Sequence, residues 1–313
     1  MEPLDDAKFS GTKEVAEHLT IEVSKLQPWI DEFVPGAGKI NSIEQFKGGQ
    51  SNPTYKIITK SKNLVLRRKP PGKLLPSAHA VDREYEVITA LYKTDVPVPK
   101  TYGLCEDDDI AGTTFFVMDF LDGDLFWDPM IPSVTNKDRK EIYQNKNKTL
   151  AKLHNVDYKK LGLQDYGKPG NYVARQVSRW SKQYRASETD DIEAMNNLIE
   201  WLPKNIPDDD ETSIVHGDYR LDNMILKDNK VIGILDWELS TLGHPIADFS
   251  YHCLSWRTQE AFWVMLNSKN LESLAKKNIW KCTVRILGKI LQRIGNFIWP
   301  LICSKLQESY KEF

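Results

Sequence analysis

The spacing of apolar residues divides the chain into a strand-rich first part and a helix-rich second part. Apolar positions recur at helical spacing over residues 22–33 and 81–92. Around these two segments, short alternating or apolar runs bounded by turn residues predict strands. These runs cover residues 43–47, 54–59, 63–68, 101–105 and 113–121. The pattern predicts a sheet with one inserted helix.

The pattern changes near Gly123 and the proline-bearing segment 128–132. Most of the chain after this segment has helical spacing, and two short strands interrupt the helices near residues 213–238. The expected helices cover residues 138–155, 172–187 and 190–202. We therefore predict an α+β fold with a small β-rich N-terminal lobe, residues 1–122, and a mainly helical C-terminal lobe, residues 123–313.

Composition adds limits to this picture. The chain has 313 residues, enough for a sizeable core, and its 41% hydrophobic and 27% charged residues are ordinary for a globular protein. The net charge of -2 and a sequence pI of about 6.3 argue against a nucleic-acid partner, because nucleic-acid-binding domains are usually strongly basic.

The two ends of the chain bear on its location. The first fifteen residues lack the apolar core of a secretory signal, and the four cysteines form no C-x-x-C pair, so we expect a reducing, intracellular and cytoplasmic setting. The apolar segment 279–303 carries a basic residue every fourth position, which excludes a simple membrane-spanning helix. We expect a packed helix there; the alternative is a helix that binds a membrane surface or a partner.

The segment 213–238 carries the strongest chemical signal. His216, Asp218 and Asn223 fit the H-x-D-x-x-x-x-N form of a kinase catalytic loop, and Asp236 closes the next apolar run. A carboxylate such as Asp218 can act as a base that orients an acceptor hydroxyl. Asn223 and Asp236 offer the hard oxygen ligands that magnesium prefers. The spacing therefore predicts phosphoryl transfer.

Two features of the first lobe suit a nucleotide. The polar turn at residues 48–53 includes Gly48, Gly49, Ser51 and Asn52. Its backbone N–H groups could face phosphates; a plain hairpin turn is the alternative. A cationic strand comes after the turn, and one of its side chains is expected to reach the phosphates.

Glu84 on the next helix could pair with that side chain. The alternative is a solvated basic edge strand, which suits Arg68 and Lys69 because neighbouring side chains point to opposite faces. Farther along, an adenine ring could bind to backbone groups near Asp119, Phe120 and Leu121.

Several stretches support a resemblance to a known family. They are His216-Gly217-Asp218 with Asn223, Asp236-Trp237-Glu238, and residues 96–99. With them the chain resembles the aminoglycoside-phosphotransferase-like and choline-kinase-like small-molecule kinases. Residues 48–54 and 66–72, with Gly243-His244-Pro245 and Asp248, make it look closest to the kinase-like domain fused to some acyl-CoA dehydrogenases.

The resemblance covers residues 20–256 and implies a bilobal protein-kinase-like fold, ATP as donor and Mg²⁺ as cofactor. It implies Asp218 as base, Asn223 and Asp236 as metal ligands, and Arg67–Glu84 as the phosphate-positioning pair. Two departures matter. Arg67 stands where the wider family has lysine, and Trp237-Glu238 replaces Phe-Gly after the metal-binding aspartate.

We therefore expect a Mg-ATP-dependent kinase that phosphorylates a small-molecule hydroxyl, and the resemblance points to a hydroxyacyl-CoA type of acceptor. A protein kinase is disfavoured because Asp-Phe-Gly and Ala-Pro-Glu sequences are absent. A non-catalytic nucleotide-binding or scaffold protein is the other alternative. The helical stripe at residues 175–184 could line an acceptor site, or be half core and half solvent; His154 is expected to be a packed helical residue.

Overall fold

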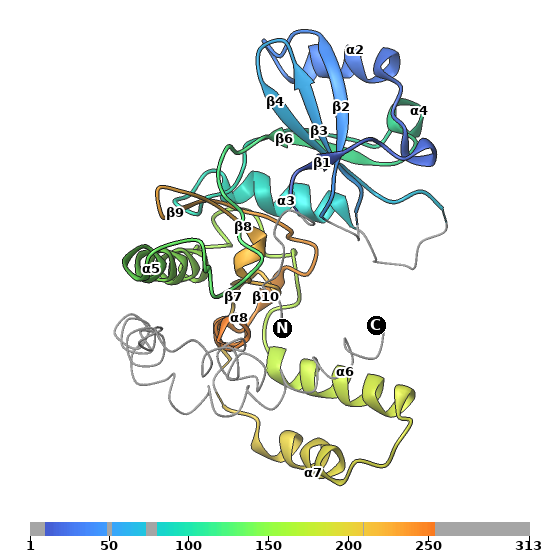
Figure 1. Ribbon diagram of the computed structural model, residues 1–313. Coiled ribbons are helices and arrows are strands. Elements are labelled where there is room, and N and C mark those ends of the chain that lie inside the picture. The colour runs from blue at the N-terminus through green and yellow to red at the C-terminus, as the bar shows by residue number, and fades with distance from the viewer. Residues whose placement is uncertain (1–9, 49–51, 73–79, 209, 254–313) are drawn as a thin grey trace. The chain divides into compact units, whose positions relative to one another are not determined.

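The computed structural model describes residues 10–48, 52–72, 80–208 and 210–253 of the chain. Contacts between Cα atoms divide them into two compact units (Figure 1). The first holds the described residues up to Ser133 together with Leu221–Glu238, and the second holds Val134–Arg220 and the described residues from Leu239 onward. The first unit is therefore made of two separate stretches of the chain. The lobe boundary expected between residues 122 and 123 stays a prediction.

A six-stranded antiparallel sheet with strand order β1-β2-β3-β4-β6-β5 forms the base of the first unit (Figure 1). Its strands are β1 (Thr12–Lys13), β2 (Ile40–Phe46), β3 (Thr54–Thr59), β4 (Asn63–Arg68), β5 (Thr101–Cys105) and β6 (Phe115–Asp119). The five strands expected from the apolar runs are all present, which confirms the predicted sheet. The two-residue strand β1 carries no pattern of its own and was not predicted.

One face of the sheet is covered by α2 (Val23–Phe33). The Trp29 ring of α2 meets the Phe115 ring of β6 edge-on, with centroids 5.1 Å apart. Gly103 in β5 makes room for this helix, since a Cβ there would lie 3.0 Å from the Trp29 ring. These residues belong to a continuous apolar core that also contains the short helix α4 (Asp108–Ala111) through Ala111.

The helix α3 (Val81–Leu91) packs against β5 and β6. Its Tyr85 ring lies 6.1 Å from the Phe116 ring. Phe115 and Phe116 are neighbours in one strand, so their side chains point to opposite faces of the sheet. The helices α2 and α3 therefore lie on opposite faces.

This alternation places two consecutive arginine side chains on different faces of the sheet. In the β4–β6 ladder Arg67 lies opposite Phe116, and Arg68 lies opposite Phe115. Side chains directly opposite each other in a ladder share a face. Arg67 consequently points to the α3 side, and Arg68 points to the α2 side.

The alternative of a solvated edge strand is wrong for Arg68. β4 lies between β3 and β6, and Arg68 is only 4% exposed. Its guanidinium donates hydrogen bonds to the carbonyl oxygens of Ala111 and Leu19, and it lies over the Tyr55 ring. Burial of a charge is tolerated here because these acceptors replace water. Pattern reasoning missed them because they come from distant parts of the chain.

A tight hairpin completes the first unit. It consists of β8 (Met224–Lys227) and β9 (Lys230–Ile234), joined by Asp228 and Asn229. Both turn residues have positive φ angles, 49° and 60°, as a two-residue hairpin turn with the twist of the strands requires. The backbone N–H of Asp124 donates a hydrogen bond to the carbonyl oxygen of Leu226. This bond links the hairpin to the segment that follows β6.

The second unit is mainly helical. Its helices are α5 (Asn136–His154), α6 (Tyr172–Ser187), α7 (Glu193–Trp201) and α8 (Pro245–His252), and its strands β7 (Ser213–Val215) and β10 (Thr241–Gly243) pair antiparallel. The three helices expected from the sequence are confirmed. In α6, Tyr184 is buried while Arg179 and Gln183 are exposed, so the stripe is half core and half solvent.

Some sequence expectations lie outside the described residues. These are the roles of Gly49, Ser51 and the C-terminal segment 279–303. Among the helices of the described ranges, none is long and apolar enough to cross a membrane.

Replacing Arg68 by methionine should lower the stability of the protein. The carbonyl oxygen of Ala111 would lose its donor, at a cost of about 1–3 kcal/mol for a buried unsatisfied group, while Leu19 keeps the hydrogen bond from the Tyr55 hydroxyl. Urea denaturation followed by circular dichroism measures the effect. The matched control is Lys69→Met, because Lys69 is partly exposed and pairs with Asp82 on the surface. Equal losses in both variants would contradict the structural role of Arg68.

Candidate active site

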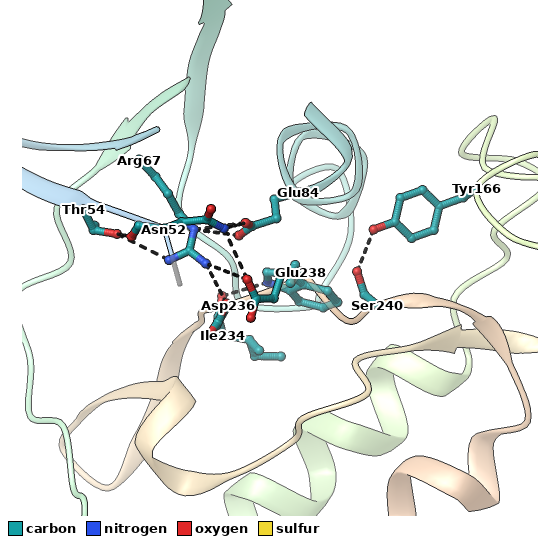
Figure 2. A network of polar contacts seen from close by, with 10 residues as sticks. Asn52, Thr54, Arg67, Glu84, Tyr166, Ile234, Asp236, Glu238 and Ser240 are labelled. Atoms are coloured by element: carbon teal, nitrogen blue, oxygen red, sulfur yellow. Dashed lines mark hydrogen bonds and ion pairs between the residues drawn. The ribbon is translucent and has the colours of Figure 1, made fainter. Parts of the chain in front are cut away.

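Arg67 lies at the centre of an ionic cluster in the first unit, and its partners Asp236 and Glu238 are partly exposed (Figure 2). Its Nε is 3.0 and 2.9 Å from the two carboxylate oxygens of Glu84, and its Nη2 is 2.7 Å from Oδ1 of Asp236. Nη1 donates to Oγ1 of Thr54 at 3.3 Å. The ion pair expected between Arg67 and Glu84 is therefore present. The contact with Asp236 was not expected.

Asn52 and Glu238 complete this cluster. The side-chain amide of Asn52, which is fully buried, donates to Glu84 at 3.1 Å and to Glu238 at 3.2 Å. Oε2 of Glu238 also lies 3.9 Å from Arg67 Nη2. Asn52 was predicted to serve the phosphates through its turn. In the structure its side chain connects two carboxylates, and a contact with phosphates stays a prediction.

The cluster contains more negative charge than positive charge. One guanidinium is shared by the carboxylates of Glu84, Asp236 and Glu238. Burial, with the nearby Asp236 and Glu238, raises the pKa of Glu84 to about 7 although Arg67 lowers it. The same carboxylates outweigh the effect of burial on Arg67 and raise its pKa. Oε2 of Glu84 is buried and accepts no hydrogen bond from the described residues, because Nε–H of Arg67 points to Oε1.

The hairpin places the two predicted metal ligands in register. Asn223 directly precedes β8, and Asp236 follows β9 by two residues. The carbonyl oxygen of Asn223 accepts a hydrogen bond from Leu235 N–H at 2.9 Å, which continues the hairpin ladder to the residue before Asp236. Asp236 has a φ of 62°, a left-handed conformation that is uncommon outside glycine.

Among the described residues, Asp236 also belongs to a group of three carboxylates that could bind a metal ion together. Carboxylate oxygens of Glu84, Asp236 and Glu238 lie within 4.8 Å of one another. An all-oxygen donor set of this kind suits a hard divalent cation such as Mg²⁺. The residues present therefore fit the expected metal ion.

The predicted base Asp218 lies in the second unit, on the loop after β7. Gly217 in this loop has a φ of 83°, and a Cβ there would lie 2.6 Å from the carbonyl oxygen of Leu239. Only glycine fits such a position without strain. Arg220 pairs with Asp218, its Nε lying 3.2 Å from Oδ1.

Asp248 of α8 holds this loop in place. Its carboxylate accepts hydrogen bonds from the backbone N–H groups of His216 at 2.5 Å and Gly217 at 2.7 Å, and His154 Nε2 lies 3.3 Å away. Burial alone would raise the pKa of Asp248. The bond and charge of His154, with the loop groups, outweigh burial and lower the pKa. His154 is packed in α5, as predicted, and supports the loop through Asp248.

The predicted adenine site is only partly compatible with the hydrogen bonds. The N–H of Asp119 donates to Lys100, and the Asp119 side chain accepts from Tyr102 at 2.6 Å, so this N–H is already used. The Phe120 ring stacks with Phe46, their centroids 6.4 Å apart. Contacts of an adenine ring with Phe120 and Leu121 stay predictions.

Comparison with known proteins assigns the family. A family model described as the phosphotransferase enzyme family matches residues 42–268, which is most of the chain. The chain belongs to the phosphotransferase enzyme family. The family predicted from the motifs is therefore confirmed.

Solved structures agree with this assignment. A Ralstonia eutropha protein assigned to the aminoglycoside phosphotransferases is 42% identical to this phosphotransferase, with a TM-score of 0.80, over 92% of this chain and 88% of that chain. A ternary complex of streptomycin, ATP and APH(2″)-IIa has a TM-score of 0.58 at 16% identity, over 88% of this chain and 85% of that chain. The second likeness shows the fold alone. The predicted kinase-like α+β fold is confirmed.

Curated relatives contain this phosphotransferase chain within longer proteins. Mouse acyl-CoA dehydrogenase family member 10 is 48% identical over 259 residues, which are 82% of this chain and 24% of the mouse protein. Human acyl-CoA dehydrogenase family member 11 is 42% identical over 255 residues, which are 78% of this chain and 33% of the human protein. The chain thus spans a quarter to a third of these relatives.

Sequence reasoning missed two residues of the candidate site. Glu238 joins the Arg67 cluster, and Asp248 supports the loop that carries Asp218. Glu238 follows Asp236 at a spacing of two, which could have signalled a shared face. Asp248 was noted only as part of a family motif, and no local pattern shows that a buried carboxylate binds backbone groups about thirty residues earlier.

Glu84 should make stability depend on pH. Its pKa of about 7 lies above the ordinary value of 4.5, so the folded state binds this proton more tightly than the unfolded state. The resulting stabilisation is complete below about pH 4.5 and is lost as the pH rises through 7. In Glu84→Gln this loss should be absent, as measured by urea denaturation at pH 5 and pH 8. Glu86→Gln, at an exposed position of the same helix, should keep the wild-type pH dependence; identical profiles for the Glu84 variant and the wild type would contradict the assignment.

Proposed function

We propose that this chain is a Mg²⁺- and ATP-dependent kinase that transfers the γ-phosphate of ATP to a hydroxyl group of a small molecule. The observation that carries the proposal is the ionic cluster in which Arg67 of β4 binds Glu84 of α3 and Asp236 after β9 (Figure 2). A cation and metal-binding carboxylates gathered in this way suit a polyphosphate and its metal ion.

In this proposal each residue has one role. Asp218 accepts the proton of the acceptor hydroxyl while the hydroxyl oxygen bonds to the γ-phosphorus and the bond to ADP breaks. Arg67, held by Glu84, binds the phosphates of the nucleotide. Asn223 and Asp236 hold Mg²⁺, which would offset the negative charge of the phosphates. Backbone N–H groups near Gly48 and Asn52 face the phosphates.

The catalytic loop is built for this task. Asp248 binds the backbone N–H groups of His216 and Gly217, so Asp218 directly follows a rigid turn. A base on a rigid loop loses little free energy when it orients the acceptor.

For the acceptor, we propose a hydroxyacyl-CoA. The support is that relatives 42–48% identical to this chain are named acyl-CoA dehydrogenases. An aminoglycoside is polycationic and would favour an acidic acceptor surface. The exposed side of α6 carries Arg179, Lys182 and Arg185, which suits an anionic acceptor better.

Asp218→Asn should remove phosphoryl transfer. Loss of a general base lowers kcat by roughly 10²–10⁴-fold, while the thermal stabilisation by Mg-ATP should persist because the amide is isosteric. Asp228→Asn is the matched control, since Asp228 is an exposed turn residue that asparagine can replace at positive φ. Retained activity in the Asp218 variant would exclude it as base. If the wild type binds nucleotide but transfers phosphate to no acceptor, the result favours the scaffold alternative.

The acceptor class is tested by ADP release. A hydroxyacyl-CoA should stimulate ADP release from ATP well above the matching acyl-CoA that lacks the hydroxyl, because only the hydroxyl accepts phosphate. Mass spectrometry of the product should show phosphate on the acyl chain. Equal stimulation by both compounds, or a clear preference for an aminoglycoside, would contradict this acceptor class.

A further inference from the structure

The guanidinium of Arg67 uses all three of its nitrogen atoms. Nε binds Glu84, Nη1 donates to Thr54, and Nη2 binds Asp236. The residue is only 7% exposed, so solvent offers no replacement for a lost partner. Figure 2 shows the side chain extended between the carboxylates of α3 and of the segment after β9. Asp236 therefore already has a cation bound to one of its oxygens.

The cluster nonetheless has enough negative charge to bind a second cation. Glu84, Asp236 and Glu238 bring three carboxylates within reach of one guanidinium. One oxygen of Glu84, a residue that is 1% exposed, accepts no hydrogen bond from the described residues. Three carboxylates against one guanidinium leave an excess of negative charge. A divalent cation would correct this excess.

A metal ion on the Asp236 oxygen that Arg67 uses would lie close to the guanidinium. A magnesium ion lies about 2.1 Å from its ligand oxygen. Nη2 of Arg67 is 2.7 Å from the same oxygen, so the two positive charges would repel each other at short range. This repulsion weakens metal binding at Oδ1 as long as Arg67 keeps its contact with Asp236.

We propose that Arg67 and a divalent metal ion compete for Asp236, so that the metal ion binds tightly only once nucleotide phosphates hold Arg67 instead. This inference rests on the proposed function, which makes Asp236 a metal ligand and Arg67 a phosphate ligand. Phosphate oxygens supply the negative charge that draws the guanidinium from Asp236. The nucleotide thereby prepares the metal site, and metal and nucleotide binding become strongly cooperative.

Arginine suits this competition better than lysine. Its planar fork holds Glu84, Thr54 and Asp236 at the same time, whereas an ammonium group is a single point charge on a flexible stem. A lysine at this position would keep the pair with Glu84 and leave Asp236 more accessible. Arg67→Lys should therefore behave between the wild type and a variant without charge.

Binding of Mn²⁺ to the nucleotide-free protein, followed by electron paramagnetic resonance, tests the proposal. Arg67→Gln should bind Mn²⁺ about tenfold or more tightly than the wild type, a difference that a modest loss of repulsion can produce. Lys69→Gln removes the same charge from a partly exposed neighbour and should bind Mn²⁺ as the wild type does. In the wild type, ADP should raise the Mn²⁺ affinity at least about tenfold.

Further variants separate this inference from the proposed function. In Arg67→Gln, adding Asp236→Asn should abolish the gained Mn²⁺ site. If the ADP complex of Asp236→Asn binds Mn²⁺ as tightly as the ADP complex of the wild type does, Asp236 is not a metal ligand and the proposed function fails. If Asp236→Asn does weaken Mn²⁺ binding but Arg67→Gln binds Mn²⁺ no more tightly than the wild type, only the proposed competition is wrong. Should Arg67→Gln fail to fold, a wild-type coupling between ADP and Mn²⁺ of less than about twofold overturns the competition.

Discussion

The alternation of side chains along one central strand is the constraint on which the first unit depends. Because Arg67 and Arg68 are neighbours in β4, they enter opposite faces of the sheet, and both are buried. Arg68 finds backbone carbonyl oxygens on the α2 face and acts as a structural cation. Arg67 finds carboxylates on the α3 face and forms the centre of the candidate active site. Two chemically identical side chains thus have different tasks because the strand pleat separates them.

The two units contribute different parts of the proposed chemistry. The first carries the cationic and carboxylate groups that suit a nucleotide and its metal ion, and the second carries the loop with Asp218. Each part is held by a buried carboxylate. Glu84 holds Arg67, and Asp248 holds the loop of His216 and Gly217. Both supports are almost fully buried, so they stiffen the site without facing solvent.

The sequence predicted the elements of the fold well, because helical spacing and strand alternation are local properties. It also identified Asp218, Asn223 and Asp236 as candidates, since their spacing lies within a single segment. It could not show that Asp236 binds Arg67, because 169 residues separate them and only the folded sheet and hairpin bring them together. For the same reason it missed the burial of Arg68, whose partners Ala111 and Leu19 lie on two other segments.

The hairpin of β8 and β9 has a consequence for how this site can evolve. Asn223 and Asp236 stand at the open end of a ladder whose closed end is a two-residue turn. The register of this ladder already shifts once, between Ile225 and Leu226, and a further inserted or deleted residue that shifts the pairing would turn one of these side chains to the other face. Natural variation in this segment should therefore consist of exchanged side chains at constant length, with any insertions placed at the turn of Asp228 and Asn229.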